Sequence, residues 1–209
     1  KQSLDTRSSS NQLRNKMPRV YFGEDWLKDS PVNLWKNELM HFPLILTSDD
    51  IKKSTDILDQ VSIPELRAIR LHNETTYTWN RLCYETDNPP HLRIECRYLP
   101  AGPSIADEIA NFAFWIGLMK GQPENWDELQ EGLQFKVVKD NFTRAARTGL
   151  DCVLDWMGES MTAKKLILEK LIPLAKKGLK RCNINQEDID KYLGIIQARV
   201  DSEQTGSKW

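Results

Sequence analysis

The stretch His91-Leu-Arg-Ile-Glu-Cys-Arg-Tyr98 is the most informative part of this sequence. Because side chains alternate between the two faces of an extended strand, it predicts a β-strand with one charged and one apolar face. The charged face holds His91, Arg93, Glu95 and Arg97, and the apolar face holds Leu92, Ile94, Cys96 and Tyr98. A carboxylate flanked by guanidinium groups suits a packed core poorly. It is well suited to binding an anion, or a metal ion that carries one.

The same alternation has a simpler explanation, in which the strand has a solvated face whose charges form ordinary cross-strand pairs. The preceding segments favour a binding site instead, because they add small polar groups and more basic side chains. In an extended chain these residues are Thr76, Thr78 and Asn80 on one face, Arg81 on the other face, and Arg70 with His72 further upstream. Arginine for phosphate oxygens, a carboxylate for a hard cation and small donors for orientation are what a phosphate and metal site requires.

Three runs of strand-like composition lie in the middle of the chain: Pro64–His72, Thr75–Tyr84 and His91–Tyr98. Asn73-Glu74 is a plausible turn between the first two runs, and Asp87-Asn88-Pro89-Pro90 breaks the chain before the third. Because short turns join antiparallel neighbours, we expect a meander of about three strands that forms one part of a larger sheet.

Most of the remaining sequence has helical spacing. The predicted helices are Pro31–Phe42, Asp49–Gln60, a helix from Ser104 to Gly121, Trp126–Trp156, Ala163–Arg181 with a kink at Pro173, and a helix from Asn185 to about Val200. Ser104 and Asn185 are the expected N-caps. The helix after Ser104 has apolar residues around most of its circumference, so we expect it to be deeply buried.

These elements predict an α+β fold in which a small antiparallel sheet packs with a mostly helical C-terminal half. We expect one domain over residues 1–209, with a polar segment and short helices in 1–62, the antiparallel meander in 63–100 and helices in 101–209. Residues 1–20 are polar and show little periodicity.

Composition narrows the functional classes. The 29 basic and 30 acidic residues give a net charge of −1, so no overall field attracts nucleic acid or a membrane surface. No apolar run reaches the length of a membrane-spanning helix. The cysteines are far apart and form no Cys-x-x-Cys pair, which predicts reduced thiols in a cytoplasmic protein; they are Cys83, Cys96, Cys152 and Cys182.

Two segments resemble the glutamate–cysteine ligase family, and are closest to its bacterial branch of carboxylate–amine ligases. They are His72-Asn-Glu-Thr-Thr-Tyr-Thr-Trp-Asn-Arg81 and Pro90-His-Leu-Arg-Ile-Glu-Cys-Arg-Tyr-Leu-Pro-Ala-Gly-Pro103. The combination of Arg-x-Glu-x-Arg with Leu-Pro-Ala-Gly-Pro and a following helix is more specific than either motif. The resemblance continues in Asp107–Met119, Asp140–Arg147, Asp190–Gly194 and Thr205–Trp209, and so covers most of the chain after about Pro18.

The resemblance implies ATP-dependent amide formation, in the cytoplasm, as in glutathione biosynthesis. ATP would phosphorylate a carboxylate of glutamate, and an amine would attack the acyl phosphate. Transferred by position, Glu95 would be a ligand of Mg²⁺, and Arg97 and Arg81 would contact phosphate or the substrate carboxylate as catalytic residues. Arg93 and Arg97 would bind the nucleotide, and the partners would be ATP and amino acids.

Related ligases build this site on a larger concave sheet whose first strands supply further metal-binding carboxylates. Residues 1–66 contain no Glu-x-Glu strand. The resemblance therefore implies the C-terminal portion of a larger ligase, whose missing carboxylates come from a preceding segment or a second chain, or whose activity has been lost. The alternative is a non-enzymatic helical interaction or regulatory module in which the sheet is structural.

Overall fold

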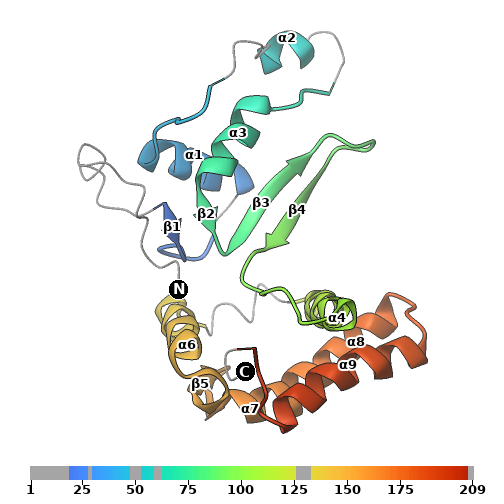
Figure 1. Ribbon diagram of the computed structural model, residues 1–209. Helices are drawn as coiled ribbons and strands as arrows, with labels where there is room; N and C mark the ends of the chain where they lie inside the picture. The colour runs from blue at the N-terminus through green and yellow to red at the C-terminus, as the bar shows by residue number, and fades with distance from the viewer. Residues whose placement is uncertain (1–18, 28–29, 48–52, 59–62, 126–132, 207–209) are drawn as a thin grey trace. The chain divides into compact units, whose positions relative to one another are not determined.

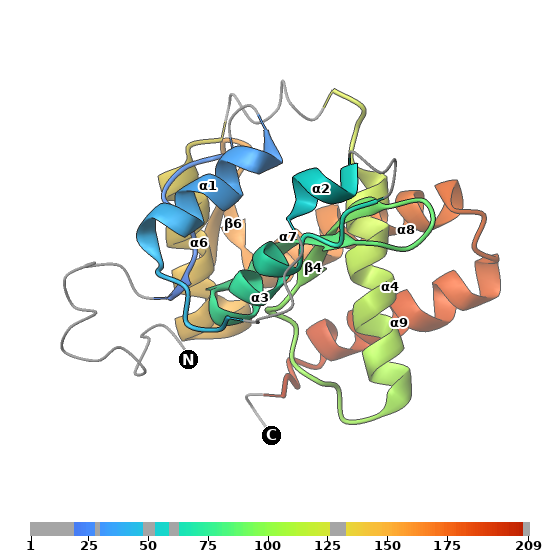
Figure 2. The same cartoon turned by 90° about the horizontal axis from the view of Figure 1, so that it is seen from above.

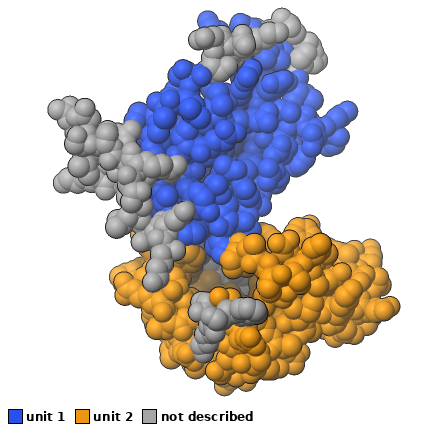
Figure 3. Space-filling view, in the orientation of Figure 1, with its two compact units in different colours: residues 1–98 blue, residues 99–209 orange. Residues whose placement is uncertain are grey.

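The structure is a computed structural model that describes residues 19–27, 30–47, 53–58, 63–125 and 133–206. The chain divides into two compact units, residues 1–98 and residues 99–209, coloured separately in Figure 3. The predicted α+β class is confirmed, since helices occur together with small sheets. Each sheet in the described part of the chain has two strands.

Unit 1, residues 1–98, combines short helices with a parallel strand pair and an antiparallel hairpin (Figure 1). Its elements are β1 (Val20–Tyr21), α1 (Pro31–His41), α2 (Ser54–Leu58), α3 (Arg67–Thr75), β2 (Tyr77–Thr78), β3 (Asn80–Glu85) and β4 (His91–Cys96). Strand β1 pairs with β2, and β3 pairs with β4. Of the helix predicted over Asp49–Gln60, α2 forms the centre, and residues 49–52 and 59–60 lie outside the described residues.

Helix α1 confirms the prediction of a helix over Pro31–Phe42. The Ser30 hydroxyl accepts a hydrogen bond from the Val32 amide at 3.2 Å, and Pro31 occupies the first turn, where its missing N–H costs nothing. Trp35 and Phe42 are buried. These two buried side chains therefore anchor α1 to the core of unit 1.

The predicted strand Pro64–His72 is wrong, because this region forms helix α3. Inward-facing positions recur every three or four residues there, which is the period of a helix and not of a strand. These positions are Ile69, His72, Asn73 and Thr76, all buried or half-buried, whereas Arg67, Arg70 and Glu74 are exposed. The meander consequently loses its first strand.

The other two predicted strands form an antiparallel hairpin, as expected. The run Thr75–Tyr84 is interrupted at Trp79, so that β2 joins β1 and β3 joins β4. Within the hairpin Arg81 lies directly opposite Glu95, and Cys83 lies opposite Arg93. This register decides which charged side chains meet.

Unit 2, residues 99–209, is mainly helical (Figure 2). Its elements are α4 (Ile105–Gly121), α6 (Phe135–Thr148), the 3₁₀ turn η2 (Gly149–Asp151), β5 (Val153–Trp156), β6 (Glu159–Thr162), α7 (Ala163–Leu166), the π-helical turn η3 (Ile167–Leu171), α8 (Ile172–Arg181) and α9 (Gln186–Asp201). Helix α4 packs on α8 and α9. Ala175, Leu179, Ile189 and Leu193 form the centre of the core.

The predicted helix Trp126–Trp156 is only partly right. Residues 126–132 lie outside the described residues, α6 is helical, and Val153–Trp156 is strand β5, paired with β6. Gly149 at the end of α6 and Gly158 in the hairpin turn both have positive φ. Glycine tolerates this conformation, so these two residues end the helix and reverse the strand.

The helical run predicted over Ala163–Arg181 is confirmed, with the expected irregularity at Pro173. The π-helical turn η3 ends two residues before Pro173, which lies in the first turn of α8. Proline removes one backbone donor, and the wider turn accommodates that loss without ending the run. Asn185 caps α9 by accepting from the Asp188 amide at 2.7 Å, as the sequence predicts.

Helix α4 begins at its predicted cap, where the Ser104 hydroxyl accepts from the Asp107 amide at 3.3 Å. The expectation that α4 is deeply buried is wrong for its large side chains. Its buried residues are small (Ala110, Gly117 and Gly121), whereas Ile105 is 76% and Phe112 63% exposed. The helix packs against α8 through its glycines, and its large residues Phe114, Ile116 and Leu118 are only partly buried against the core.

Gly117, Gly121 and Gly178 allow the backbones of α4 and α8 to approach closely. A Cβ atom added to Gly178 would lie 2.5 Å from the Gly121 nitrogen and 2.9 Å from the Gly117 carbonyl carbon. These are backbone atoms, so neither helix relieves the clash by turning a side chain away.

We predict that Gly178→Ala destabilises unit 2 by about 1–3 kcal/mol, because the two helices must separate. The matched control is Gly194→Ala in α9, where an added Cβ has nothing within 4 Å. That substitution should stabilise the protein by about 0.5–1 kcal/mol through helix propensity. Urea unfolding followed by circular dichroism measures both, and equal effects would contradict the packing described.

Candidate functional site

The β3–β4 hairpin turns its charged face towards α3 and its apolar face towards solvent. On the inner face Cys83 is 7% exposed, whereas Leu92 and Ile94 on the outer face are 47% and 52% exposed. A half-buried antiparallel pair normally shows the opposite arrangement. The charged side chains of the hairpin therefore lie on its inner face, where burying a charge costs free energy.

Arg81 and Glu95 form an ion pair on the inner face. Nε and Nη2 of Arg81 lie 2.7 Å and 2.5 Å from Oε2 of Glu95, and the side chains are 19% and 33% exposed. Arg81 Nη1 also donates to the Asn73 carbonyl at 3.2 Å, which ties the hairpin to α3. The Cys83 thiol donates to the same Oε2 at 3.6 Å. The described contacts to Glu95 thus all use one carboxylate oxygen.

Arg97 follows β4 and lies against an aromatic ring. Its Cζ is 3.8 Å from the centroid of Tyr77, and its backbone nitrogen donates to the Trp79 carbonyl at 2.9 Å. The Nη1 atom is buried and, among the described residues, has no hydrogen-bond partner. A guanidinium stacked on a ring keeps its edge donors directed outward in the plane. Nη1 of Arg97 is therefore a buried cationic donor without an acceptor among the described residues.

The electrostatics follow from this geometry. Burial alone would raise the pKa of Glu95, but the hydrogen bonds and charge of Arg81, together with the charge of Arg97, outweigh it and lower that pKa. Two guanidinium groups around one carboxylate leave a net positive charge. Burial raises the pKa of the Cys83 thiol, which disfavours a thiolate nucleophile.

Arg93 belongs to a different pair. Its Nη2 and Nε lie 2.6 Å and 2.8 Å from Oε1 of Glu85, and its side chain is 47% exposed. The hydrogen bond from Arg93 to Glu85 raises the pKa of Arg93. The structure thus brings Arg81, Glu95 and Arg97 together, while Arg93 is engaged with Glu85; its nucleotide-binding role stays a prediction.

The charged face does not by itself fit a magnesium ion. Hard cations require several oxygen ligands, and Glu95 is the single carboxylate of the Arg81–Glu95–Arg97 group. No group of three or more His, Cys, Asp or Glu side chains suited to a metal occurs in the part of the chain that the structure describes. The assignment of Glu95 as a metal ligand remains a prediction.

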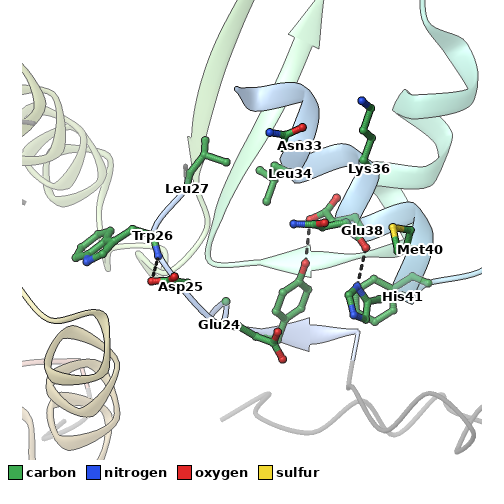
Figure 4. Close-up of a pocket in the computed structure, with 14 residues that line it drawn as sticks. Glu24, Asp25, Trp26, Leu27, Asn33, Leu34, Lys36, Glu38, Met40 and His41 are labelled. Atoms are coloured by element: carbon green, nitrogen blue, oxygen red, sulfur yellow. Dashed lines mark hydrogen bonds between the residues drawn. The ribbon is translucent and has the colours of Figure 1, made fainter. Parts of the chain in front are cut away.

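Sequence reasoning missed a second buried carboxylate, that of Glu38 in α1. Glu38 is 5% exposed and accepts a hydrogen bond from the Tyr21 hydroxyl at 3.1 Å (Figure 4). It falls three residues after Trp35 and four before Phe42, within the apolar stripe of the helix. A charged residue on that stripe was the available signal.

In unit 2 the Leu-Pro-Ala-Gly-Pro motif has a structural role. Gly102 packs against Asp107, where an added Cβ would lie 2.5 Å from the Asp107 Cβ. Arg199 of α9 donates to Asp107 and to Asn111 of α4, each at 2.8 Å. The motif, α4 and α9 line a hollow of about 750 Å³. These contacts fasten the start of α4 to α9.

The Arg81–Glu95 pair makes a pH-dependent contribution to stability. Because the folded pKa of Glu95 is lowered from 4.5, this contribution is present above pH 4.5 and is lost as the pH falls through the folded value. We predict that Glu95→Gln destabilises the protein by about 0.5–1.5 kcal/mol at pH 7, a range that allows for solvent screening. The loss should shrink below that folded pKa.

The control is Glu85→Gln, which removes the partner of the more exposed Arg93 and should cost less than Glu95→Gln at pH 7. Urea titrations of both variants and the parent protein at several pH values provide the comparison. Equal and pH-independent losses in the free energy of unfolding would show that the Arg81–Glu95 pair stabilises the protein no more than the exposed Arg93–Glu85 pair.

None of the described helices is long and apolar enough to cross a membrane. Comparison of the chain with protein-family models, with curated proteins and with solved structures finds no match. The geometry of Arg81, Glu95 and Arg97 and the resemblance of the surrounding motifs are therefore what indicates a function.

Proposed function

We propose that this chain is part of an ATP-dependent carboxylate–amine ligase similar to glutamate–cysteine ligases, and that Arg81 and Arg97 bind its anionic reactants. The observation that carries this proposal is the buried, unpaired Nη1 of Arg97 beside the Arg81–Glu95 pair. Leaving a buried guanidinium nitrogen without an acceptor costs stability, and a bound phosphate or carboxylate removes that cost.

In the proposed reaction a carboxylate oxygen attacks the γ-phosphorus of ATP, and the bond to the β,γ-bridging oxygen breaks to release ADP. The amine nitrogen then attacks the carbonyl carbon of the acyl phosphate, loses a proton and expels inorganic phosphate. Both steps involve dispersed negative charge on phosphoryl oxygens, which fixed guanidinium groups stabilise. Positioning of the two reactants supplies the rest of the rate enhancement.

Arg97 is assigned to the transferred phosphoryl group or the substrate carboxylate, because its Nη1 has no acceptor among the described residues. Arg81 is assigned mainly to orientation, since Glu95 and Asn73 already hold its guanidinium group in place. Mg²⁺ would neutralise charge on the nucleotide when bound, but the described residues do not complete a site for it. Further carboxylates must come from outside the described residues.

The remaining features of the proposal concern partners and location. ATP and amino acids are the proposed small-molecule partners, and a further chain segment or a second subunit would supply the missing part of the site. We place the protein in the cytoplasm, where ATP is present and where its four free cysteines stay reduced.

One observation favours a second candidate, a non-enzymatic interaction module. The hairpin charges pair with each other, Arg81 with Glu95 and Arg93 with Glu85, as a purely structural sheet requires. Arg97 separates the two functions, because its Nη1 has no partner among the described residues. A structural sheet has no use for that atom.

We predict that the protein binds ATP in the presence of magnesium chloride, and that Arg97→Gln weakens this binding at least about tenfold. A hydrogen bond to a charged group contributes about 1.5–3 kcal/mol, which corresponds to that factor or more. Isothermal titration calorimetry measures both affinities directly.

The charge-matched control is Arg70→Gln, which removes an exposed arginine from α3 in the same unit and should leave the affinity for ATP unchanged. Equal affinities of the Arg97 and Arg70 variants would exclude Arg97 from the phosphate site. Absence of any ATP binding by the parent protein would favour the interaction module.

A further inference from the structure

A hollow of about 530 Å³ lies between the segment after β1 and helix α1 in unit 1, and it is separate from the charged face of the hairpin. Its volume is within the range of small-molecule sites. Its walls include apolar side chains, among them Leu27, Leu34 and Phe42. Figure 4 shows Glu38 at the centre of this region, on the face of α1 that carries Asn33 and Leu34.

The Glu38 carboxylate is the main polar feature of the hollow. One of its oxygens, Oε1, accepts a hydrogen bond from the Tyr21 hydroxyl at 3.1 Å. The residue is 5% exposed and forms no ion pair in that part of the chain. A carboxylate in so buried a residue is costly to ionise, and a bound cation that donates to it offsets that cost.

The surrounding charges determine which ligand suits this carboxylate. Glu24 and Asp25 also line the hollow and are exposed at its rim, so acidic groups outnumber basic ones there. Lys36 is the lining lysine, and Figure 4 shows its amino group directed away from Glu38. The potential therefore favours a cation, and the apolar walls favour one with an organic body.

The basic side chains that act on Glu38 do not form an ion pair with it among the described residues. Arg81 lies close enough to lower the pKa of Glu38, but its guanidinium group is bound to Glu95. His72 also acts on Glu38, and its Nε2 donates to the Phe42 carbonyl at 3.0 Å. Both groups are thus engaged elsewhere, and Glu38 retains the capacity to bind a further donor.

We propose that this hollow binds the ammonium group of a small organic amine, with Glu38 as its anionic partner and the apolar wall residues around its carbon body. The binding claim stands independently of the ligase proposal. A role for the bound ligand as the acceptor amine rests on that proposed function.

The test compares two probes that differ in one group, 2-phenylethylammonium chloride and the neutral 2-phenylethanol. We expect the parent protein to bind the ammonium probe with a dissociation constant on the order of 1 mM, as fragments of this size do, and the alcohol at least about tenfold more weakly. Saturation-transfer NMR and calorimetry without ATP give both values. Equal affinities, or no binding at about 10 mM, would overturn the proposal.

Glu38→Gln should weaken binding of the ammonium probe at least about tenfold, because it keeps the shape and removes the charge. The matched control is Glu159→Gln, an exposed carboxylate of β6 in unit 2, which should leave binding unchanged. A folded Glu38→Gln protein that binds the ammonium probe normally would also refute the assignment. The two-probe comparison on the parent protein decides the question if that variant does not fold.

The pH dependence provides a second readout. The groups that act on Glu38 are Tyr21 from β1, His72 from α3 and Arg81 from β3. Glu24, Asp25, Lys36 and His41 also line the hollow. Burial raises the pKa of Glu38 despite the opposing effects of Tyr21, His72 and Arg81. Affinity for the ammonium probe should therefore fall on acidification, starting at a higher pH than for an exposed carboxylate, and Glu38→Gln should abolish this dependence. An unchanged pH dependence in the variant would assign it to another group.

The outcomes for the two proposals are distinguishable. If the parent protein does not bind ATP, the ligase proposal is refuted and amine binding can still be measured separately. If the ammonium probe and the alcohol bind equally well, the proposal for the hollow is refuted and the Arg97→Gln test of ATP binding is unaffected.

Discussion

The ion pair between Arg81 and Glu95 is the interaction on which the organisation of unit 1 depends. It connects the two strands of the hairpin at directly opposed positions, and Arg81 extends it to the Asn73 carbonyl of α3. Replacing the pair by apolar side chains would remove a desolvation penalty, so stability alone does not explain why the inner face carries charge. The arrangement does explain how Glu95 is held ionised beside Arg97.

The inward position of these charged residues also explains why the outer face of the hairpin is apolar. Because the charged residues occupy the inner positions, strand alternation forces Leu92 and Ile94 outward, where about half of each residue is exposed. Helix α4 in unit 2 shows a comparable compromise, since its glycines pack inward and Phe112 is left exposed. In the hairpin the inward charged residues leave apolar side chains on the exposed face, and in α4 the inward glycines leave large apolar side chains exposed.

The sequence predicted the helices well where local signals were strong. Ser104 and Asn185 cap their helices through side-chain hydrogen bonds, and the run to Arg181 tolerates Pro173 through a π-helical turn. It failed where two periodicities compete over a short segment. Residues 64–72 have a composition compatible with a strand, and only the inward spacing of Ile69, His72 and Asn73 reveals a helix. The predicted helix is wrong over residues 153–156 because Gly149, with positive φ, ends α6 and Gly158 turns the β5–β6 hairpin.

The charged site was predictable in part for the same reason. Alternation placed Glu95 and Arg97 on one strand and Arg81 on the next, but it gave no information on register, which pairs Arg81 with Glu95 and leaves Arg93 to Glu85. The environment of Glu38 could not be predicted from the sequence, because its neighbours Tyr21, His72 and Arg81 come from three other elements that only tertiary packing brings together. Unit 1 therefore contains a buried guanidinium nitrogen, Nη1 of Arg97, that lacks a partner among the described residues, and a buried carboxylate, Glu38, that accepts from the Tyr21 hydroxyl. A buried cationic donor and a buried carboxylate are both costly for a purely structural domain, and they are the complement required by reactants that carry a phosphate or carboxylate and an amine.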